Sequence, residues 1–151
     1  MPLILVLSGP NLNMLGVRDP ALYGSHTLKD IEAMCAEKCR ALGFDLDFRQ
    51  SNHEGELVTW IQEARESIAG LVINAGAYTH TSLAIHDALE LLAPVPIIEV
   101  HLSDPKQREE FRHFSYIESL AADRICGQKA QGYVIALDRL AALLSLKPNL
   151  L

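Results

Sequence analysis

The amino-acid sequence predicts an α/β protein with a doubly wound parallel sheet of five strands and helices on both faces. Short apolar runs alternate along the chain with longer segments whose apolar residues recur at helical spacing. This alternation is typical of parallel strands joined by right-handed crossover helices. The chain shows no internal repeat, low-complexity run or linker, so we expect residues 1–151 to form a single domain.

The first part of the chain supplies one strand, one loop and one helix. Residues 3–7 form an apolar run that predicts a buried strand, and residues 14–25 have no clear periodicity. A loop of that length in a compact domain is often functional, and we interpret it as a lid. Thr27 and Asp30 form a variant of the capping box, and Gly43 ends the helix that they begin. The inner face of this helix is expected to contain Leu28, Ile31, Cys35 and Leu42.

The middle of the chain repeats the strand–helix pattern. Residues 44–48 alternate between apolar and polar, which predicts a strand at a sheet edge with one wetter face. Ser51 and Asn52 are expected to open the next helix. Residues 71–73 are continuously apolar, as in a strand buried on both faces. The apolar positions of the intervening helix are Leu57, Ile61, Ala64 and Ile68.

The last part begins with a helix that carries Ile85, Leu89 and Leu92 inward and stops before Pro94. The remaining elements are a strand at 97–101, a charged segment at 106–114, a short strand at 124–126 and an apolar helix at about 131–146. Within the charged segment, Arg108 and Arg112 are spaced one helical turn apart.

Composition and charge exclude several classes of protein. Hydrophobic residues make up 49% of the chain and charged residues 21%, which indicates a folded globular protein. The net charge of −6 argues against nucleic acid or an anionic membrane as the main partner. The apolar residues 2–7 are too few for a signal peptide or a membrane span. Three cysteines without a paired framework predict reduced thiols and a cytoplasmic protein, and we interpret Cys35 and Cys39 as packing residues.

Polar side chains follow the ends of three predicted strands. Because the carboxyl ends of parallel strands meet at one edge of a sheet, we expect these side chains to share a crevice, with Arg18 and Tyr23 on the loop above it. Arginines, histidines and amides gathered in an acidic chain predict a pocket for a small anion that carries hydroxyl groups. The polar residues at the strand ends are Asn11, Asn13, Asn74, His80, His101 and Ser103, with Arg108 and Arg112 close behind.

The same crevice lacks several familiar kinds of chemistry. Residues 9–16 match neither of the glycine-rich phosphate loops, and the histidines have no carboxylates at metal-ligand spacing. Schiff-base chemistry needs a lysine, and no lysine falls at a predicted strand end. Lys106 is expected in a loop, and the lysines expected in helical patterns are Lys29, Lys38, Lys129 and Lys147. We therefore expect neither a metal nor a cofactor.

Acid–base catalysis remains. A fixed cation favours the ionised form of a phenol, so Tyr23, five residues after Arg18, is a candidate general base. His101 is the candidate acid, with Glu99 on the same strand face to orient it. Each residue alone has a simpler interpretation: Tyr23 as a surface aromatic, His101 as a satisfied histidine at a strand end, and Arg112 as part of a solvated helix face. Thr81 and Ser82 are better explained as a helix cap, and Asp87 and Glu118 are compatible with plain surface carboxylates.

A set of motifs, running in order along nearly the whole chain, resembles the type II 3-dehydroquinate dehydratase family. The matching segments are 9–16 with Arg18, Pro20 and Tyr23-Gly24, then 74–77, 80–82, 87–89, 99–103, 108–112 and Gly132-Tyr133. The resemblance implies a flavodoxin-like fold and a lyase that dehydrates 3-dehydroquinate to 3-dehydroshikimate in the shikimate or quinate pathways. It also implies catalysis without a metal or a Schiff base, in agreement with the residues themselves.

The resemblance implies a role for each residue that handles protons. Tyr23 resembles the base that removes the proton next to the ketone, and Arg18 on the lid resembles the group that keeps it ionised. Asn11 resembles the residue that holds a water facing the enolate. His101 resembles the acid that protonates the departing hydroxyl, with Glu99 as its support.

Other positions resemble the substrate-binding residues of the family. Asn74, the backbone at Leu102 and Ser103, and the Ser103 hydroxyl resemble a cradle for the substrate carboxylate. His80 and Arg112 resemble ligands of the ring hydroxyls.

The resemblance also implies closure and assembly. Arg108 resembles part of the closing lid, and Asp87 a residue lent to the site by a neighbouring subunit. The family assembles trimers into a dodecamer, so the resemblance implies a homo-oligomer of that size. The sequence departs from the family pattern at Asp104, at Phe114 and at residues 128–130.

Two other functions are compatible with parts of the sequence. A flavodoxin-like binding module for a nucleotide or small anion would not need Tyr23, His101 and Arg18 together. A hydrolase would use Ser103 or Ser82 as nucleophile, but the chain contains no Gly-x-Ser-x-Gly elbow.

Overall fold

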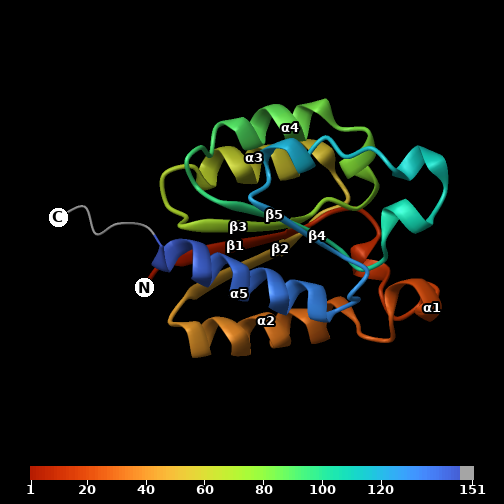
Figure 1. Cartoon of the computed structure of the whole chain (residues 1–151), viewed down its shortest axis with the longest axis horizontal. Coiled ribbons are helices and arrows are strands. Elements are labelled where there is room, and N and C mark those ends of the chain that lie inside the picture. The colour runs from red at the N-terminus through yellow and green to blue at the C-terminus, as the bar shows by residue number, and fades with distance from the viewer. Residues whose placement is uncertain (147–151) are drawn as a thin grey trace.

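The computed structural model describes residues 1–146, which form a parallel five-stranded sheet between two layers of helices (Figure 1). The strand order β2-β1-β3-β4-β5 is the flavodoxin-like order, so the predicted fold class is confirmed. All four strand pairs are parallel, and every carboxyl end therefore lies at the same edge. The strands are β1 (Leu3–Ser8), β2 (Asp45–Gln50), β3 (Gly70–Asn74), β4 (Ile97–His101) and β5 (Asp123–Cys126).

Two helices cover each face of the sheet. In Figure 1, α2 and α5 lie below the strands, and α3 and α4 lie above them. The helices are α1 (Pro20–Tyr23), α2 (Leu28–Leu42), α3 (Glu54–Ala64), α4 (Leu83–Glu90) and α5 (Gln131–Ser145). Within residues 1–146, no helix combines the length and the hydropathy needed to cross a membrane.

The apolar side chains form two cores, one on each face of the sheet. Alternate residues of a strand point to opposite faces, so Ile4 and Val6 pack against α2 and α5 whereas Leu5 and Leu7 pack against α3 and α4. Each fully buried side chain of this kind contributes roughly 1.5–3 kcal/mol. The expected packing role of Cys35 and Cys39 is confirmed, because both lie in the first core.

Several predicted boundaries are confirmed. The Thr27 side chain accepts from the backbone of Asp30, and Asp30 in turn accepts from Thr27, so the capping box is present. Gly43 ends α2 with a φ of 78°, a left-handed conformation that glycine adopts without strain. The strand β2 lies at the sheet edge and is mostly half-buried, as its alternation predicted. Ser82 caps α4 by accepting from the backbone N–H of Ile85.

Three boundaries differ from the prediction. The helix α3 begins at Glu54 and not at Ser51, because the buried Ser51 hydroxyl accepts from the backbone of His53 and forms a turn first. Ile68 lies beyond the end of α3, although it packs in the same core. The lid is not wholly irregular, since the Asp19 carboxylate caps the short helix α1.

The charged segment and its lysines also differ from the prediction. Arg108 and Arg112 do not share a continuous helix: two separate 3-10 turns form, at Pro105–Gln107 and Glu110–Arg112. Lys129 was expected in a helical pattern but precedes α5 with a left-handed φ of 54°. The expectation for Lys147 lies outside the described residues.

Candidate active site

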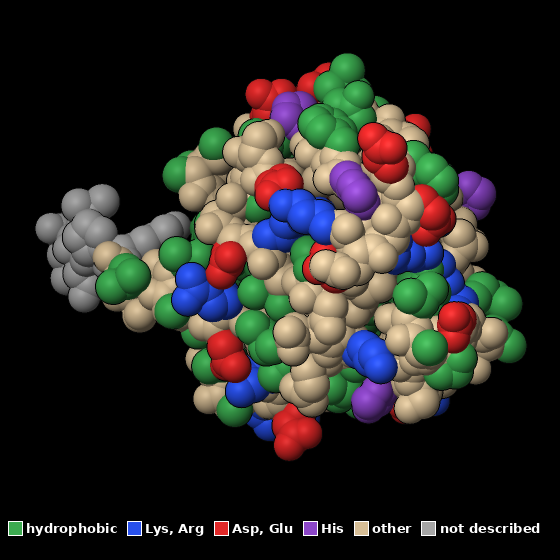
Figure 2. Space-filling model, turned by 45° about the vertical axis from the view of Figure 1, so that its right-hand side comes forward, with side chains coloured by type: hydrophobic (Ala, Val, Ile, Leu, Met, Phe, Trp, Pro, Cys, Tyr) green, Lys and Arg blue, Asp and Glu red, His purple; other side chains and the backbone are tan. Residues whose placement is uncertain are grey.

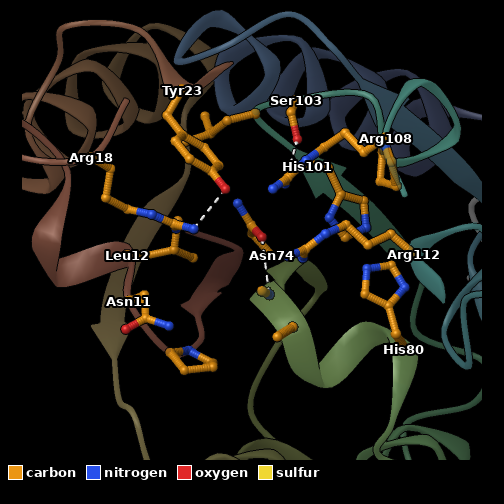
Figure 3. Close-up of a pocket in the computed structure, with 15 residues that line it drawn as sticks. Asn11, Leu12, Arg18, Tyr23, Asn74, His80, His101, Ser103, Arg108 and Arg112 are labelled. Atoms are coloured by element: carbon orange, nitrogen blue, oxygen red, sulfur yellow. Dashed lines mark hydrogen bonds between the residues drawn. The ribbon is translucent and has the colours of Figure 1, made fainter. Parts of the chain in front are cut away.

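A cleft of about 120 Å³ opens at the carboxyl ends of β1, β3 and β4, and Arg18 and Tyr23 lie on one side of it (Figure 3). This is the edge at which doubly wound sheets bind ligands. The volume is below the range typical of drug-sized ligands, so the cleft suits a small metabolite. Its lining residues are Pro10, Asn11, Leu12, Arg18, Tyr23, Asn74, Gly76, Ala77, His80, His101, Leu102, Ser103, Pro105, Arg108 and Arg112.

The floor of the cleft is a contact between two backbones. The N–H of Gly9, just after β1, donates to the carbonyl of Asn74 at the end of β3 over 2.8 Å. A Cβ atom at position 9 would overlap the carbonyl of Ala75, so only glycine fits this approach. Gly76 has a φ of 62° and donates its N–H to the Asn74 side chain, which fixes that amide at the floor.

Asn11 is held in a left-handed conformation, with a φ of 70°. Its backbone N–H donates to the side-chain oxygen of Asn52 over 3.0 Å. The Gln50 amide donates to that same oxygen and to the carbonyl of Gly9, so residues at the carboxyl end of β2 fix the loop after β1. Neither Gln50 nor Asn52 was identified in this role from the sequence. The sequence feature that could have identified them is their position at the carboxyl end of β2, which pairs with β1 in the sheet.

Arg18 and Tyr23 contact each other on the lid. The Arg18 Nη2 donates to the Tyr23 hydroxyl over 2.7 Å, and its guanidinium carbon lies 3.8 Å from the centre of the tyrosine ring. The guanidinium of Arg108 approaches the same ring at 5.5 Å. Two cations therefore surround one phenol, and negative charge on its oxygen would be stabilised.

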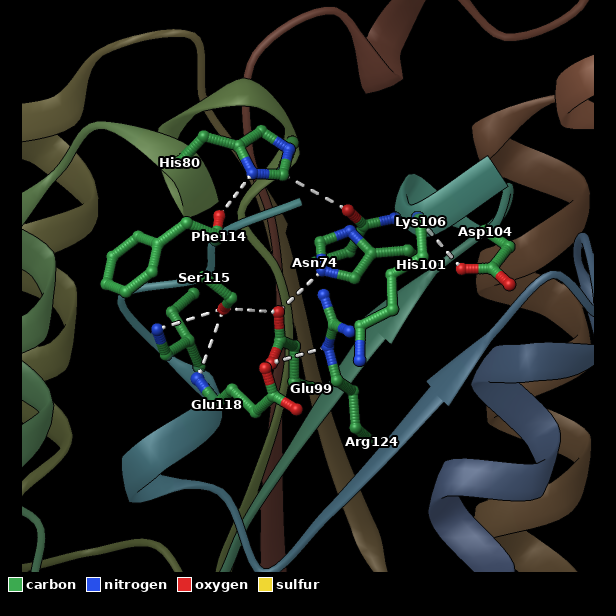
Figure 4. A network of polar contacts seen from close by, with 12 residues as sticks. Asn74, His80, Glu99, His101, Asp104, Lys106, Phe114, Ser115, Glu118 and Arg124 are labelled. Atoms are coloured by element: carbon green, nitrogen blue, oxygen red, sulfur yellow. Dashed lines mark hydrogen bonds and ion pairs between the residues drawn. The ribbon is translucent and has the colours of Figure 1, made fainter. Parts of the chain in front are cut away.

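His101 and Glu99 form a buried pair across the cleft from Tyr23 (Figures 3 and 4). The His101 Nε2 lies 2.6 Å from Glu99 Oε2, which also accepts from the Ser115 hydroxyl over 2.8 Å. Because the carboxylate accepts, Nε2 carries the hydrogen, and Nδ1 is left to gain or release a proton. Arg124 on β5 places its Nε 3.1 Å from the other oxygen of Glu99. Neither Ser115 nor Arg124 was identified from the sequence.

The Glu99 carboxyl is fully buried, and burial alone would favour its neutral form. The hydrogen bond and charge of His101, the charge of Arg124 and the hydroxyl of Ser115 outweigh this desolvation. The pKa of Glu99 is therefore lowered below its ordinary value, and the group is a carboxylate at neutral pH.

His80 is set up as a neutral hydrogen-bond acceptor. Its Nδ1 lies 2.7 Å from the carbonyl of Phe114, so Nδ1 carries the hydrogen and Nε2 keeps its lone pair. Burial, with the charges of His101 and Arg112, lowers the pKa of His80 despite that hydrogen bond. A neutral imidazole with a free Nε2 suits a hydroxyl donor on a ligand.

The remaining wall is cationic. Arg108 donates to the Ser103 hydroxyl over 3.3 Å, and Arg112 binds both carboxylate oxygens of Glu109 at 3.1 and 3.2 Å. The cleft is lined by three arginines, and none of its described lining residues is Asp, Glu or Lys. On the face of the molecule that Figure 2 shows, basic, acidic and histidine side chains are interspersed with apolar ones. The cleft therefore favours an anion, although the chain as a whole is acidic.

The structure brings together ten of the residues expected at the site. Glu99 lies behind His101 and does not line the cleft, and Asp87 is exposed on α4. Asn13, also expected at this edge, is exposed and is not a lining residue. The ten are Asn11, Arg18, Tyr23, Asn74, His80, His101, Leu102, Ser103, Arg108 and Arg112.

Two other features bear on the predicted chemistry. Among the described residues, His86, Asp87 and Glu90 bring three potential metal-ligand atoms within 4.8 Å of one another, but they lie on α4 and do not line the cleft. Ser82 is buried, and its hydroxyl is engaged in capping α4, which disfavours it as a nucleophile.

Comparisons with known proteins agree with this geometry. The profile of the family Dehydroquinase class II matches residues 2–141. A "3-dehydroquinate dehydratase 2" from Pseudomonas putida is 56% identical over 143 residues, which cover 95% of each chain. A "3-dehydroquinate dehydratase" from Mesorhizobium japonicum is 54% identical and covers 95% of this chain and 100% of its own. The crystal structure of a type II dehydroquinase from Butyrivibrio crossotus superposes with a TM-score of 0.89 at 44% identity, over 92% of this chain and 97% of that one.

The matches extend over almost the whole of the described chain, and they include the strand ends that build the cleft. By fold, by sequence and by the residues gathered at the carboxyl edge of its sheet, this chain belongs to the class II dehydroquinase family.

Proposed function

We propose that this chain dehydrates 3-dehydroquinate to 3-dehydroshikimate through an enolate, with the Tyr23 tyrosinate as base and His101 as acid. The observation that carries the proposal is the placement of the Arg18–Tyr23 pair and the His101–Glu99 pair on either side of one cationic cleft. Such a cleft can take a small anion, remove a proton at one side and deliver a proton at the other.

The first step is removal of the proton next to the ketone. A neutral phenol is too weak a base for this proton, so the step requires tyrosinate. The Arg18 guanidinium, 2.7 Å from the phenol oxygen, stabilises that anion. The proton passes to Tyr23, and the electron pair of the C–H bond moves onto the ketone oxygen to form the enolate. Asn11 at the cleft floor holds the water that faces this oxygen.

The second step expels water. The enolate electrons return to form the conjugated double bond, and the bond between the neighbouring carbon and its hydroxyl breaks. The hydroxyl oxygen keeps that electron pair and takes a proton from Nδ1 of His101. Glu99 orients the imidazole through Nε2 and compensates its positive charge beforehand.

The substrate is held by groups that match its own. Its carboxylate is bound by the Asn74 amide, by the backbone at Leu102 and Ser103, and by the Ser103 hydroxyl. Its ring hydroxyls are bound by His80, whose free Nε2 accepts, and by Arg112. Arg108, which contacts both Ser103 and the Tyr23 ring, closes over the bound substrate. No metal or cofactor is assigned to any of these steps.

The experiment separates the two proton transfers. Dehydration is followed by absorbance of the conjugated enone, and exchange of the substrate α-hydrogen is followed by NMR in deuterated water. Tyr23→Phe should abolish both, with a rate loss of at least about 100-fold, because a general base contributes about 10²–10⁴. His101→Ala should block dehydration but retain slow exchange through the enolate. Tyr78→Phe is the matched control, since its hydroxyl donates to the Asn52 carbonyl and Tyr78 is not a lining residue.

Undiminished exchange in both variants would show that another residue is the base, and the assignment of Tyr23 would be wrong. Absence of dehydration by the wild type, together with a ligand affinity that Tyr23→Phe leaves unaltered, would instead favour a binding module.

We further propose that the chain is a single catalytic domain that works in the cytoplasm as a dodecamer built from trimers, with Asp87 completing the cleft of a neighbouring subunit. Asp87 is exposed on α4 and does not line the cleft of its own chain, which leaves it available to another. Light scattering combined with an activity assay tests this assembly. A fully active monomer would remove Asp87 from the site.

A further inference from the structure

A buried arginine stands behind the proposed acid. We propose that Arg124 is a positioning residue for proton release: it compensates the charge of Glu99 so that His101 can give up its proton. This inference rests on the proposed function and adds a residue that acts through Glu99 without contacting the substrate.

The fold places Arg124 beside Glu99. The two are direct partners in the parallel pairing of β4 with β5, so their side chains leave the sheet on the same face (Figure 4). The Arg124 side chain is 13% exposed and the Glu99 side chain 0%. The Arg124 Nε and Nη2 are buried and have no hydrogen-bond acceptor among the described residues, although Nε lies 3.1 Å from Glu99 Oε1. Arg124 therefore acts mainly through its charge and not through an aligned hydrogen bond.

The other oxygen of Glu99 is fixed by hydrogen bonds. The Ser115 hydroxyl accepts from the backbone N–H groups of Ile117 and Glu118, so its own hydrogen is directed to Glu99 Oε2. That oxygen also holds His101. Ser115 supplies the geometry of the carboxylate, and Arg124 supplies the compensating charge.

The summed charge of Glu99, Arg124 and His101 determines how readily His101 releases its proton. With Arg124 present, Glu99 and Arg124 sum to zero, and loss of the His101 proton leaves a neutral buried pair. Without Arg124, loss of that proton would leave an isolated buried carboxylate, which is strongly unfavourable. His101 would then retain its proton, and the hydroxyl would depart slowly.

Other charged groups also face the pair. His80 lies with its ring centre 6.4 Å from that of His101, and Arg112 lines the same cleft. Cys126 is the strand partner of His101, and Glu118 follows Ser115 on the covering loop. These groups are unchanged in Arg124 variants, so a difference between variants reports the removed charge.

The test measures the titration of His101 directly in the ligand-free protein. Histidine is labelled at Cε1, and the His101 signal among the six histidines is assigned by its absence in His101→Asn. Arg124→Met should raise the titration midpoint of His101 by about one pH unit or more, because it removes the cation that compensates Glu99 and leaves the buried carboxylate to favour protonated His101. Arg124→Gln should do the same and keeps a polar group if the methionine variant does not fold. Arg124→Lys should restore the wild-type midpoint.

The kinetics of dehydration should also report the loss of the Arg124 charge. In Arg124→Met, kcat for dehydration should fall at least about tenfold with KM nearly unchanged, while α-hydrogen exchange continues. Arg139→Met is the matched control. Arg139 on α5 pairs with Asp123, the neighbour of Arg124 on β5, but its side chain is 52% exposed. This variant should leave the midpoint and kcat unchanged.

Double variants show whether Arg124 acts through Glu99. In a Glu99→Gln background, Arg124→Met should produce a clearly smaller shift of the midpoint, because the carboxylate that Arg124 compensates is no longer present. An unchanged midpoint in both folded single variants, or an equal shift in the Glu99→Gln background, would overturn the inference. If the wild type dehydrates 3-dehydroquinate but the Arg124 variants leave the His101 midpoint unchanged, only the role of Arg124 is overturned. If the Arg124 variants shift that midpoint but the wild type does not dehydrate 3-dehydroquinate, only the proposed function is overturned.

Discussion

Removal of one buried hydroxyl, by Tyr133→Phe, should destabilise the protein measurably. Tyr133 on α5 is fully buried in the core beneath the sheet, and its hydroxyl lies 2.9 Å from the hydroxyl of Ser8 at the end of β1. Burial raises the pKa of Tyr133, so the group is a neutral phenol throughout the physiological range. This hydrogen bond joins α5 to the strand that enters the cleft floor.

The free energy of unfolding lost in Tyr133→Phe depends on the surroundings of Ser8, the hydrogen-bond partner of Tyr133. Ser8 is also 0% exposed, so water cannot replace the lost phenol. Leaving a buried hydroxyl unpaired costs about 1–3 kcal/mol in free energy of unfolding. For a domain of this size, that loss lowers the melting temperature by roughly 2–12 °C.

The assay is urea unfolding of wild type and variants at equal protein concentration. Tyr78→Phe removes the exposed hydrogen bond from another tyrosine hydroxyl, to the Asn52 carbonyl, and should cost less than Tyr133→Phe. The double variant Tyr133→Phe/Ser8→Ala removes both partners, and it should be more stable than the sum of the two single losses predicts. If Tyr133→Phe costs no more than Tyr78→Phe, or if the double variant is additive, the buried bond does not have this role.

Three further predictions follow from the site and its surroundings. Activity should survive exhaustive chelation and treatment with borohydride plus substrate, and a reduced adduct on any lysine would contradict this. Because the pKa of Glu99 is lowered in the folded protein, ionised Glu99 stabilises the fold at pH values above the ordinary carboxyl pKa of 4.5. This stabilisation is lost as the pH falls through the lower pKa of the folded state. Wild type should therefore lose more unfolding free energy than Glu99→Gln between about pH 5 and pH 3, and equal losses by urea titration would refute the linkage. Burial raises the pKa of Cys35 to about 12 and those of Cys39 and Cys126 to about 11, so a thiol reagent at pH 7.5 should label the native protein far more slowly than the unfolded protein. Rapid labelling that leaves the fold intact would show that the thiols are not protected.

Local patterns predicted most of the fold, because each pattern has one dominant physical cause. The continuous apolar run of β3 predicted a strand buried on both faces, and the alternation in β2 predicted an edge strand. Parallel topology then predicted that strand ends far apart in sequence, such as Asn74 and His101, would meet in one cleft.

Other features depend on contacts that no local pattern reports. The pairing of Glu99 with Arg124 follows from the register of β4 against β5, which the sequence does not specify. The contact between Tyr133 and Ser8 crosses 125 positions of sequence. The segment after β4 forms two 3-10 turns in place of a helix, because the Asp104 carboxylate caps a turn at Pro105 that ends after one cycle.

The contact between Gly9 and Ala75 decides where the ligand range of this cleft can be altered. Where Gly9 meets Ala75, main-chain atoms are already in contact, so a side chain cannot be trimmed there to make room. The rim, in contrast, consists of long side chains such as Arg108 and Arg112 on short turns. A variant library meant to admit bulkier ligands should therefore vary the rim and keep residues 8–10 and 74–76 constant.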